Sequence, residues 1–307
     1  LSRPSWNLAN GMGFLWNPDF TALKSAKVWL AAAGQTFFTV SVGIGVIITY
    51  ASYLSKGDDV VLSGLSAVSM NELAEVIIGG SIIIPAAFVF FGPEQIQSIA
   101  KGGAFNLGFV TMPLIFGKIF MGAFFGGMWF LLLFLAGITS SVSLAQPAVA
   151  FLEDEFNISR GKAVSIFAIA TFILCQPAVF FLGNGVVNEL DFWCGTFCLV
   201  VFATIEIIVF AWVFGMNNAW KEIHHGADMR LPGIYKFIIK YVTPVFLLVV
   251  LGAWLYQEGI PTMLLKCVSQ ADKPFILASR LFLIAIFLVL AAMVKISWDK
   301  KKRSGKI

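Results

Sequence analysis

The sequence is 307 residues long, with 59% hydrophobic residues, only 12% charged residues and 31 phenylalanines. A soluble domain of this size could not bury so much apolar surface in one core, so the composition excludes an ordinary water-soluble protein. The formal net charge of +4 comes largely from a basic run at residues 300–306, which is too short and too close to an apolar segment to indicate nucleic-acid binding.

The opening of the chain carries no secretory signal pattern. It begins at Leu1 in a polar segment, and its first methionine, Met12, has no charged and then apolar stretch before it. A sequence that opens inside a loop is typical of a fragment or a split chain, and we expect this chain to be one.

Seven apolar stretches are each long enough to cross the roughly 30 Å hydrocarbon core of a bilayer as a helix. They lie at residues 27–55, 64–91, 122–152, 161–182, 191–215, 231–256 and 275–298. The sequence therefore predicts an all-α integral membrane protein with about seven transmembrane helices. An odd number of spans puts the termini on opposite sides, and the basic tail predicts a cytoplasmic C-terminus in a multi-pass cell-membrane protein.

The first of these stretches has an unusual polar centre. Gly34, Gln35 and several hydroxyl residues precede the closely spaced Gly43 and Gly45. Glycines at this spacing can break a helix, and an unwound backbone at bilayer depth costs several kcal/mol per unsatisfied group unless it lines a cavity or meets a ligand. The pattern predicts a broken helix at a binding site, and glycines at a tight helix crossing are the alternative.

Two carboxylates, Glu72 and Glu75, lie in the next apolar stretch. Asn71 and Glu75 are four residues apart and share one helix face. Ionisable groups within a membrane normally face a bundle interior, where they pair, bind ions or carry protons. The alternative places them at headgroup depth, solvated.

The segment after the second stretch, from about 93 to 118, is amphipathic and interrupted by Gly102 and Gly103. This pattern predicts two short helices over one membrane face, a candidate lid.

The third stretch contains a cluster of hydroxyl groups from Thr139 to Ser143. A carbonyl at Ala136 bent away from the helix, with the hydroxyls of Thr139 and Ser140, would offer three neutral oxygens to a hard cation such as sodium. Such hydroxyls also bond to the carbonyl four residues earlier or join neighbouring helices, and this alternative stays open.

Taken together, these segments resemble the neurotransmitter:sodium symporter family, most closely its bacterial members of the leucine-transporter type. The resemblance is loose at residues 11–20 and dense in several blocks that occur in the family's order. These blocks are residues 34–53, 61–65, 71–75, 103–109, 136–141, 151–155 and 191–193.

The resemblance implies a fold of two inverted five-helix repeats plus two further helices, of which this chain resembles helices six to twelve. It implies three parts: an extracellular loop at residues 1–26, the second repeat at 27–215 with the lid on its outer side, and a cytoplasmic loop, two C-terminal helices and the basic tail at 216–307. The implied activity is sodium-coupled symport of a neutral, apolar amino acid by alternating access. The implied partner is a missing N-terminal five-helix half.

The resemblance also assigns site residues by position. The substrate-binding residues are Phe38, Thr39, Ser41, Ile44, Ser140 and Leu144, with Phe38 as an aromatic lid. One sodium ion takes Thr39 and Asn71, and the other takes Ala136, Thr139 and Ser140. Ile44 departs from an aromatic residue in the leucine-transporter type, which leaves the size of the substrate open.

Three further features of the resemblance concern ions and gates. Glu75 stands where animal relatives bind chloride beside a neutral residue, so we expect no chloride requirement and a proton-linked role for this carboxylate. Asp191, with Gln35 nearby, resembles the extracellular gate. Asp154, near Ser52 and Tyr53, resembles the cytoplasmic gate. A surface acid at a helix end is the alternative for each gate carboxylate.

Two other classes compete with a transporter. A non-transporting remnant or split-gene subunit would use the same polar residues only to join helices. An intramembrane enzyme has little support, because the histidines His224 and His225 fall in a predicted loop and no nucleophile with a nearby base is visible.

Overall fold

The structure, a computed structural model, describes residues 11–101, 107–266 and 268–303. The chain folds as two compact units, one of Leu1–Ala22 and Ser63–Val142 and the other of Leu23–Leu62 and Ser143–Ile307. Throughout the described residues the secondary structure is helical, without strands, which confirms the predicted all-α class.

The first unit contains most of one long helix. Residues Val60–Gly92 form this helix without interruption, and it bends at Gly92, whose φ of 79° and ψ of 171° suit glycine. The helices of this unit are α1 (Gly11–Trp16), most of α4 (Val60–Glu72), the π-helix η2 (Leu73–Gly79), α5 (Gly80–Lys101), the π-helix η3 (Leu107–Thr111), α7 (Met112–Phe116) and the first part of α8 (Gly122–Phe156).

The predicted lid region is helical on both sides of the predicted interruption. Helix α5 continues past its bend at Gly92 to Lys101, and η3 and α7 follow from Leu107 to Phe116. Gly102 and Gly103 lie outside the described residues. The core of this unit forms here, where Ala87 of α5 packs with Met112 and Ile115 of α7.

The second unit contains the remaining helices. These are η1 (Ala22–Lys24), α2 (Ala26–Thr39), α3 (Val46–Ala51), the end of α8, α9 (Arg160–Leu174), α10 (Gln176–Phe180), η4 (Leu182–Asn184), α11 (Val186–Leu190), η5 (Asp191–Phe197), α12 (Cys198–Ile208), η6 (Val209–Val213), α13 (Met216–Ile223), α14 (Ile234–Phe237), η7 (Ile238–Val242), α15 (Thr243–Trp254), η8 (Leu255–Gly259), α16 (Ile260–Met263) and α17 (Lys273–Arg303).

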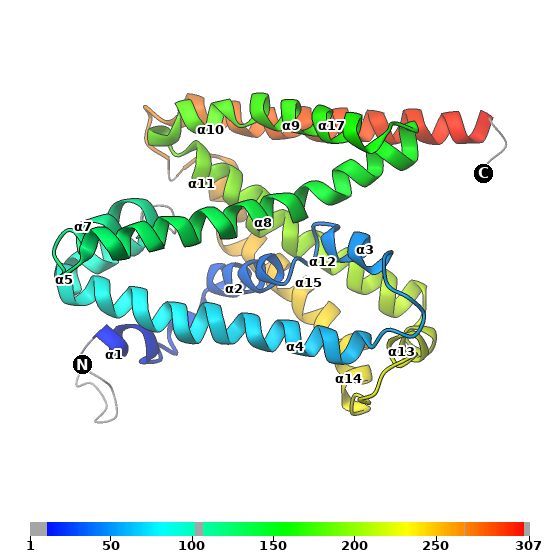
Figure 1. The fold of residues 1–307 in the computed structure, drawn as a ribbon, viewed down its shortest axis with the longest axis horizontal. Coiled ribbons are helices and arrows are strands. Elements are labelled where there is room, and N and C mark those ends of the chain that lie inside the picture. The colour runs from blue at the N-terminus through cyan, green and yellow to red at the C-terminus, as the bar shows by residue number, and fades with distance from the viewer. Residues whose placement is uncertain (1–10, 102–106, 267, 304–307) are drawn as a thin grey trace. The chain divides into compact units, whose positions relative to one another are not determined.

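Helices α2, α12 and α15 form the core of the second unit, where they lie against one another (Figure 1). Leu30 of α2 packs with Val200 of α12 and with Leu247 and Trp254 of α15, and all four side chains are almost fully buried. A second contact joins α9 and α17, which run side by side in Figure 1, with Ala163 and Met293 in one cluster. The core around Leu30 and Val200 holds α2 against α12.

Six helices in the described part of the chain are long and apolar enough to cross a membrane. They are Val60–Gly92, Gly122–Phe156, Arg160–Phe180, Val186–Val213, Ile234–Met263 and Lys273–Arg303. They match the last six of the seven predicted stretches. The most apolar stretch of Gly122–Phe156 has no buried residue, as expected of a surface whose solvent is lipid. The first predicted stretch, 27–55, is interrupted, and its interruption is the centre of the candidate site.

Candidate functional site

The predicted break in the first apolar stretch is present. Helix α2 ends at Thr39 and α3 begins at Val46. Three residues in the gap between them have left-handed backbone conformations, with φ of 59° at Ser41, 79° at Gly43 and 77° at Gly45. Because such angles cannot continue a right-handed helix, the helix is broken here, as predicted. Gly43 also lies at a close approach to α12, which is the alternative that the sequence left open.

A carboxylate from a distant helix supports the unwound backbone. The N–H of Gly43 donates a hydrogen bond to Oε2 of Glu206 in α12 at 3.2 Å. The two helices approach so closely that a Cβ on Gly43 would lie 2.8 Å from the carbonyl oxygen of Leu199. Glu206 therefore satisfies a backbone group that the break leaves without a helical partner.

Our sequence predictions did not include Glu206. A signal for it was present, because Glu206 is the single carboxylate between Phe192 and Gly215 in an otherwise apolar stretch. A lone ionisable residue in a membrane span is by default a functional candidate.

The predicted outer gate residues lie on two helices that touch. Gly34 of α2 packs against Thr196 of η5, where an added Cβ would lie 2.9 Å from the threonine Cγ2. Gln35 follows Gly34 in α2. Asp191 is the first residue of η5, and one oxygen of its carboxylate lies close to Gly195. Both Gln35 and Asp191 are exposed. The structure thus brings the elements that carry both residues together.

The C-terminal half of the broken helix, α3 with the residues after it, contacts the second half of α8. The hydroxyl of Tyr50 donates to Oγ of Ser143 at 2.9 Å, and the Gln146 amide donates to the hydroxyl oxygen of Tyr53 at 2.8 Å. The hydroxyl of Ser52 donates to its own helix, to the carbonyl of Thr49.

Asp154, which the resemblance places at a gate near Ser52 and Tyr53, is exposed. Its role at a gate stays a prediction. Gln146 bonds to Tyr53, and Arg160 links Gln146 to Glu153 through contacts of 3.3 and 3.4 Å. Gln146, Glu153 and Arg160 were not predicted.

In the first unit, Asn71 and Glu75 are paired as their spacing predicted. The Asn71 amide donates to Oε2 of Glu75 at 3.4 Å, and both side chains are half-buried. Glu75 lies 15 residues after Val60 and 17 before Gly92, near the middle of this long helix. At 1.5 Å per residue Glu75 is about 22 Å from the helix start, and its position in the interior of the bundle stays a prediction.

The hydroxyl cluster of α8 follows the back-bonding alternative at Thr139. The helix is continuous through the cluster, and the hydroxyl of Thr139 donates to the carbonyls of Leu135 at 2.9 Å and Ala136 at 3.1 Å. The sodium ligand set of Ala136, Thr139 and Ser140 stays a prediction.

The remaining predicted positions are distributed between the units. Phe38, Thr39, Ser41, Ile44 and Leu144 belong to the second unit, and Ser140 belongs to the first. Phe38 is exposed at the end of α2 and Leu144 is exposed on α8.

These observations define a class of protein. A multi-pass helical membrane protein with an unwound helix, a carboxylate that supports the gap and polar residues within its apolar helices has the architecture of a membrane transporter. A family model described as the sodium:neurotransmitter symporter family matches residues 7–297. The chain belongs to this family, whose fold is that of transporters rather than enzymes.

Individual relatives agree with this assignment. An uncharacterized sodium-dependent transporter of Methanocaldococcus jannaschii is 30% identical over 242 residues, which are 77% of this chain and 48% of the relative. The sodium-dependent nutrient amino acid transporter 1 of Drosophila grimshawi is 25% identical over 249 residues, 78% of this chain and 38% of that protein. The chain thus spans half or less of the length of these relatives.

A solved structure is similar as well. The crystal structure of MhsT in complex with L-phenylalanine matches with a TM-score of 0.69 and 29% identity, over 79% of this chain and 55% of MhsT. This similarity confirms the predicted fold of the leucine-transporter type.

Proposed function

We propose that this chain is the C-terminal half of a sodium-coupled symporter for a neutral, apolar amino acid. It corresponds to helices six to twelve of the family, and it supplies half of the substrate and ion sites. An N-terminal five-helix half, the proposed partner, supplies the rest. The length of the relatives supports this division, because the chain covers about half of each.

The observation that carries the proposal is the break between Thr39 and Val46. Its unwound backbone lies within an apolar stretch, and the carboxylate of Glu206 keeps it ordered. Backbone groups exposed by such a gap can bind the charged ends of a small substrate, which an intact helix cannot do. We place the substrate beside Phe38, Thr39, Ser41 and Ile44, with Ser140 and Leu144 completing this half.

An apolar amino acid is the proposed substrate class. The side chains that we assign to this half of the pocket carry no fixed charge, so they favour an apolar substrate side chain. MhsT is described in complex with L-phenylalanine, and a nutrient amino acid transporter is among the relatives.

Sodium is the proposed coupling ion. One ion would take Thr39 and Asn71, and the other would take the carbonyl of Ala136 with the hydroxyls of Thr139 and Ser140. Neutral carbonyl and hydroxyl oxygens are ligands that suit a hard cation such as sodium.

We propose that transport needs no chloride. Glu75 places a carboxylate beside Asn71 at mid-membrane depth, and its negative charge takes the role that an anion has elsewhere in the family. Equal uptake in chloride and in gluconate is the expected result, and a requirement for chloride would contradict it.

The proposed topology puts residues 1–26 outside the cell, the lid at 93–118 on the same side, and the C-terminus in the cytoplasm. The basic residues at the end of α17 support a cytoplasmic C-terminus.

The test is uptake of radiolabelled neutral amino acids into proteoliposomes, with sodium or potassium outside. One preparation contains this chain alone, and the other contains it joined to the five-helix first half. Uptake by the joined protein only, and only in sodium, is the expected result. The absence of uptake of every neutral amino acid by the joined protein would contradict the proposal. Sodium-driven uptake by the short chain alone would contradict the division of the site into halves.

A further inference from the structure

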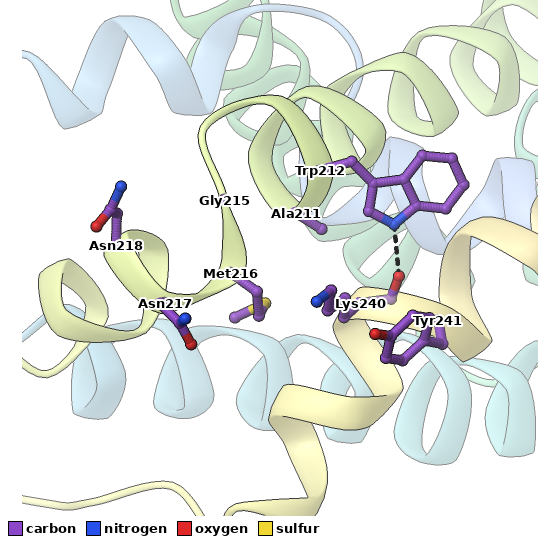
Figure 2. A pocket seen from close by; sticks show the side chains of 8 residues that line it. All are labelled: Ala211, Trp212, Gly215, Met216, Asn217, Asn218, Lys240 and Tyr241. Carbon is purple, nitrogen blue, oxygen red and sulfur yellow. Dashed lines mark hydrogen bonds between the residues drawn. The ribbon is translucent and has the colours of Figure 1, made fainter.

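A cavity of about 580 Å³ lies in the second unit, and none of its lining residues is assigned to transport. It forms between two segments. One is η6, at the end of the apolar helix Val186–Val213, and the other is η7, near the start of the next apolar helix, Ile234–Met263. Figure 2 shows its lining residues, which are Ala211, Trp212, Gly215, Met216, Asn217, Asn218, Lys240 and Tyr241.

The cavity carries a positive charge. Among the described lining residues Lys240 alone is ionisable at neutral pH, and no carboxylate joins it there. Its side chain is half-buried, and its ammonium group lies 5.0 Å from the centre of the Tyr241 ring. None of the ion pairs in the described ranges involves Lys240. A half-buried cation without a carboxylate nearby attracts an anion.

The walls of the cavity are fixed by packing and by a hydrogen bond between its two sides. The indole N–H of Trp212 donates to the carbonyl of Lys240 at 2.7 Å, which Figure 2 shows as a dashed line. Ala211 and Met216 are buried beside this contact. The two helices therefore hold the lysine in a preformed hollow.

The position of the cavity corresponds to the lipid headgroups. It lies where two membrane helices meet the loop that joins them, and Trp212 and Tyr241 are both exposed there, 46% and 48% respectively. Exposed tryptophan and tyrosine collect at this depth because each combines an apolar ring with a polar group. Asn217 and Asn218 supply polar groups on the opposite rim.

The surface beside the cavity is apolar. Val213 is 76% exposed, and Phe214, Val242 and Val245 are also exposed. All four lie close in sequence to residues that line the cavity. A free phosphate ion would meet only the polar rim, whereas a phospholipid could also place its acyl chains against these side chains. The combination favours a lipid.

We propose that this cavity binds the phosphate of an anionic phospholipid headgroup. Lys240 pairs with the phosphate, Asn217 donates a hydrogen bond to the headgroup, and Trp212 and Tyr241 flank it. The amide of Asn218 donates to the carbonyl of Phe214 at 3.2 Å, so Asn218 forms part of the rim only. This proposal is independent of the transported substrate, so it stands or falls separately from the proposed function.

The test is native mass spectrometry of the 307-residue chain in a non-ionic detergent, titrated with phosphatidylglycerol or with phosphatidylcholine. Phosphatidylglycerol is expected to bind more tightly. Lys240→Gln should weaken its binding by about fivefold, as expected for one lysine near an anionic lipid. Lys236→Gln is the matched control, because Lys236 is one helical turn earlier and does not line the cavity. It should change binding less than about twofold.

Two further variants keep the test decisive if Lys240→Gln misfolds. Lys240→Arg should retain binding, and Asn218→Asp should weaken it by adding a negative charge to an exposed position on the rim. Gel filtration and circular dichroism check that each variant is folded.

Three results would overturn the proposal. One is unchanged phosphatidylglycerol binding by folded Lys240→Gln. Another is an equal loss of phosphatidylglycerol binding in Lys236→Gln, which would mean that general surface charge, rather than the cavity, attracts the lipid. The third concerns the source of the phosphate: if millimolar inorganic phosphate displaces the lipid and binds with the same dependence on Lys240, the site takes free phosphate instead. If inorganic phosphate does not displace the lipid, the result supports a site for a phospholipid headgroup.

Discussion

The N–H of Gly43 and the carboxylate of Glu206, 163 residues apart in sequence, form a hydrogen bond of 3.2 Å across the second unit. It ties the unwound backbone of a membrane helix to an acid on the helix packed against it. Because no water is available in a bilayer core, the acceptor must come from the protein. The break is therefore a built feature of the fold, held by α12.

Replacement of Glu206 tests this support. Glu206→Ala leaves the Gly43 N–H without its acceptor, and we expect it to lower the free energy of unfolding by about 1–3 kcal/mol. Glu206→Gln keeps an oxygen and should cost less than about 1.5 kcal/mol. Thermal or denaturant unfolding in detergent measures both, and equal losses in the two variants would show that the acceptor is unimportant.

The two glycines of the break should differ in their tolerance of alanine. Gly43→Ala introduces a Cβ 2.8 Å from the carbonyl oxygen of Leu199, whereas a Cβ on Gly45 would lie 3.7 Å from Pro147 in ordinary contact. Both variants carry the cost of left-handed backbone, about 1–2 kcal/mol, and Gly43→Ala adds a clash. We expect Gly43→Ala to be the more destabilising.

The matched control is Gly64→Ala in α4, where the added methyl group meets nothing within 4 Å and the backbone is helical. It should be neutral or stabilising by about 0.5–1 kcal/mol. The same unfolding assay ranks the three variants. A loss at Gly45 as large as that at Gly43 would argue against the close approach of α12.

A largely buried ion pair should be important for stability. Arg280 of α17 pairs with Glu189 of α11 at 2.5 Å, and its other nitrogens donate to the carbonyls of Thr262 and Met263. Glu189 also accepts a hydrogen bond from Trp193. Arg280→Met or Glu189→Gln alone leaves one charge buried, and we expect each to cost about 3–5 kcal/mol.

The double variant should cost clearly less than the sum of the two single changes, because it leaves neither charge alone. Unfolding of all four proteins completes the cycle. Additive losses would mean that the two side chains are not coupled.

Sodium dependence should separate two hydroxyls of α8. Thr139→Val removes an oxygen that we assign to sodium but keeps the shape of the side chain, and it should raise the sodium concentration for half-maximal uptake by at least about tenfold. Ser141→Ala removes a hydroxyl that donates to the carbonyl of Gly137, and it should leave this value unchanged. If both hydroxyls only bond to their own helix, the two variants will behave alike.

The contact between the loop that contains Asp59 and the loop that contains Asp228 should weaken in acid. The backbone N–H of Leu62 and that of Asp228 donate to the carboxylate of Asp59, and these bonds hold the pKa of Asp59 below its ordinary value of 3.8. Since the folded pKa is the lower one, the stabilisation is complete above the ordinary value and disappears as the pH falls through the folded value.

Hydrogen exchange of the peptide 223–233, corrected for intrinsic rates, measures this effect. Protection should be constant above about pH 5 and should fall below about pH 4. Asp59→Ala should lack this acid transition. A transition that persists unchanged in Asp59→Ala would assign it to another group.

The sequence alone determined features that depend on composition and on local periodicity. Its apolar content required a membrane, since no soluble core could hold it. Gly43 and Gly45 were enough to predict the break, because only the local backbone decides whether a helix can continue. Asn71 and Glu75 were placed on one face by the helical repeat, which is also local.

Tertiary packing decided which polar side chains meet. Residues 153–155 at the end of α8 are three consecutive acids, and a local sequence pattern does not indicate which basic or polar side chain each acid contacts. In the fold Glu153 pairs with Arg160, Glu155 contacts Ser297 and Lys301, and Asp154 is exposed. Successive residues on a helix point about 100° apart, so the neighbours of α8 select a different partner for each acid. Glu206 and Gly43 met for the same reason: a contact between distant residues depends on how helices pack, which no local pattern specifies.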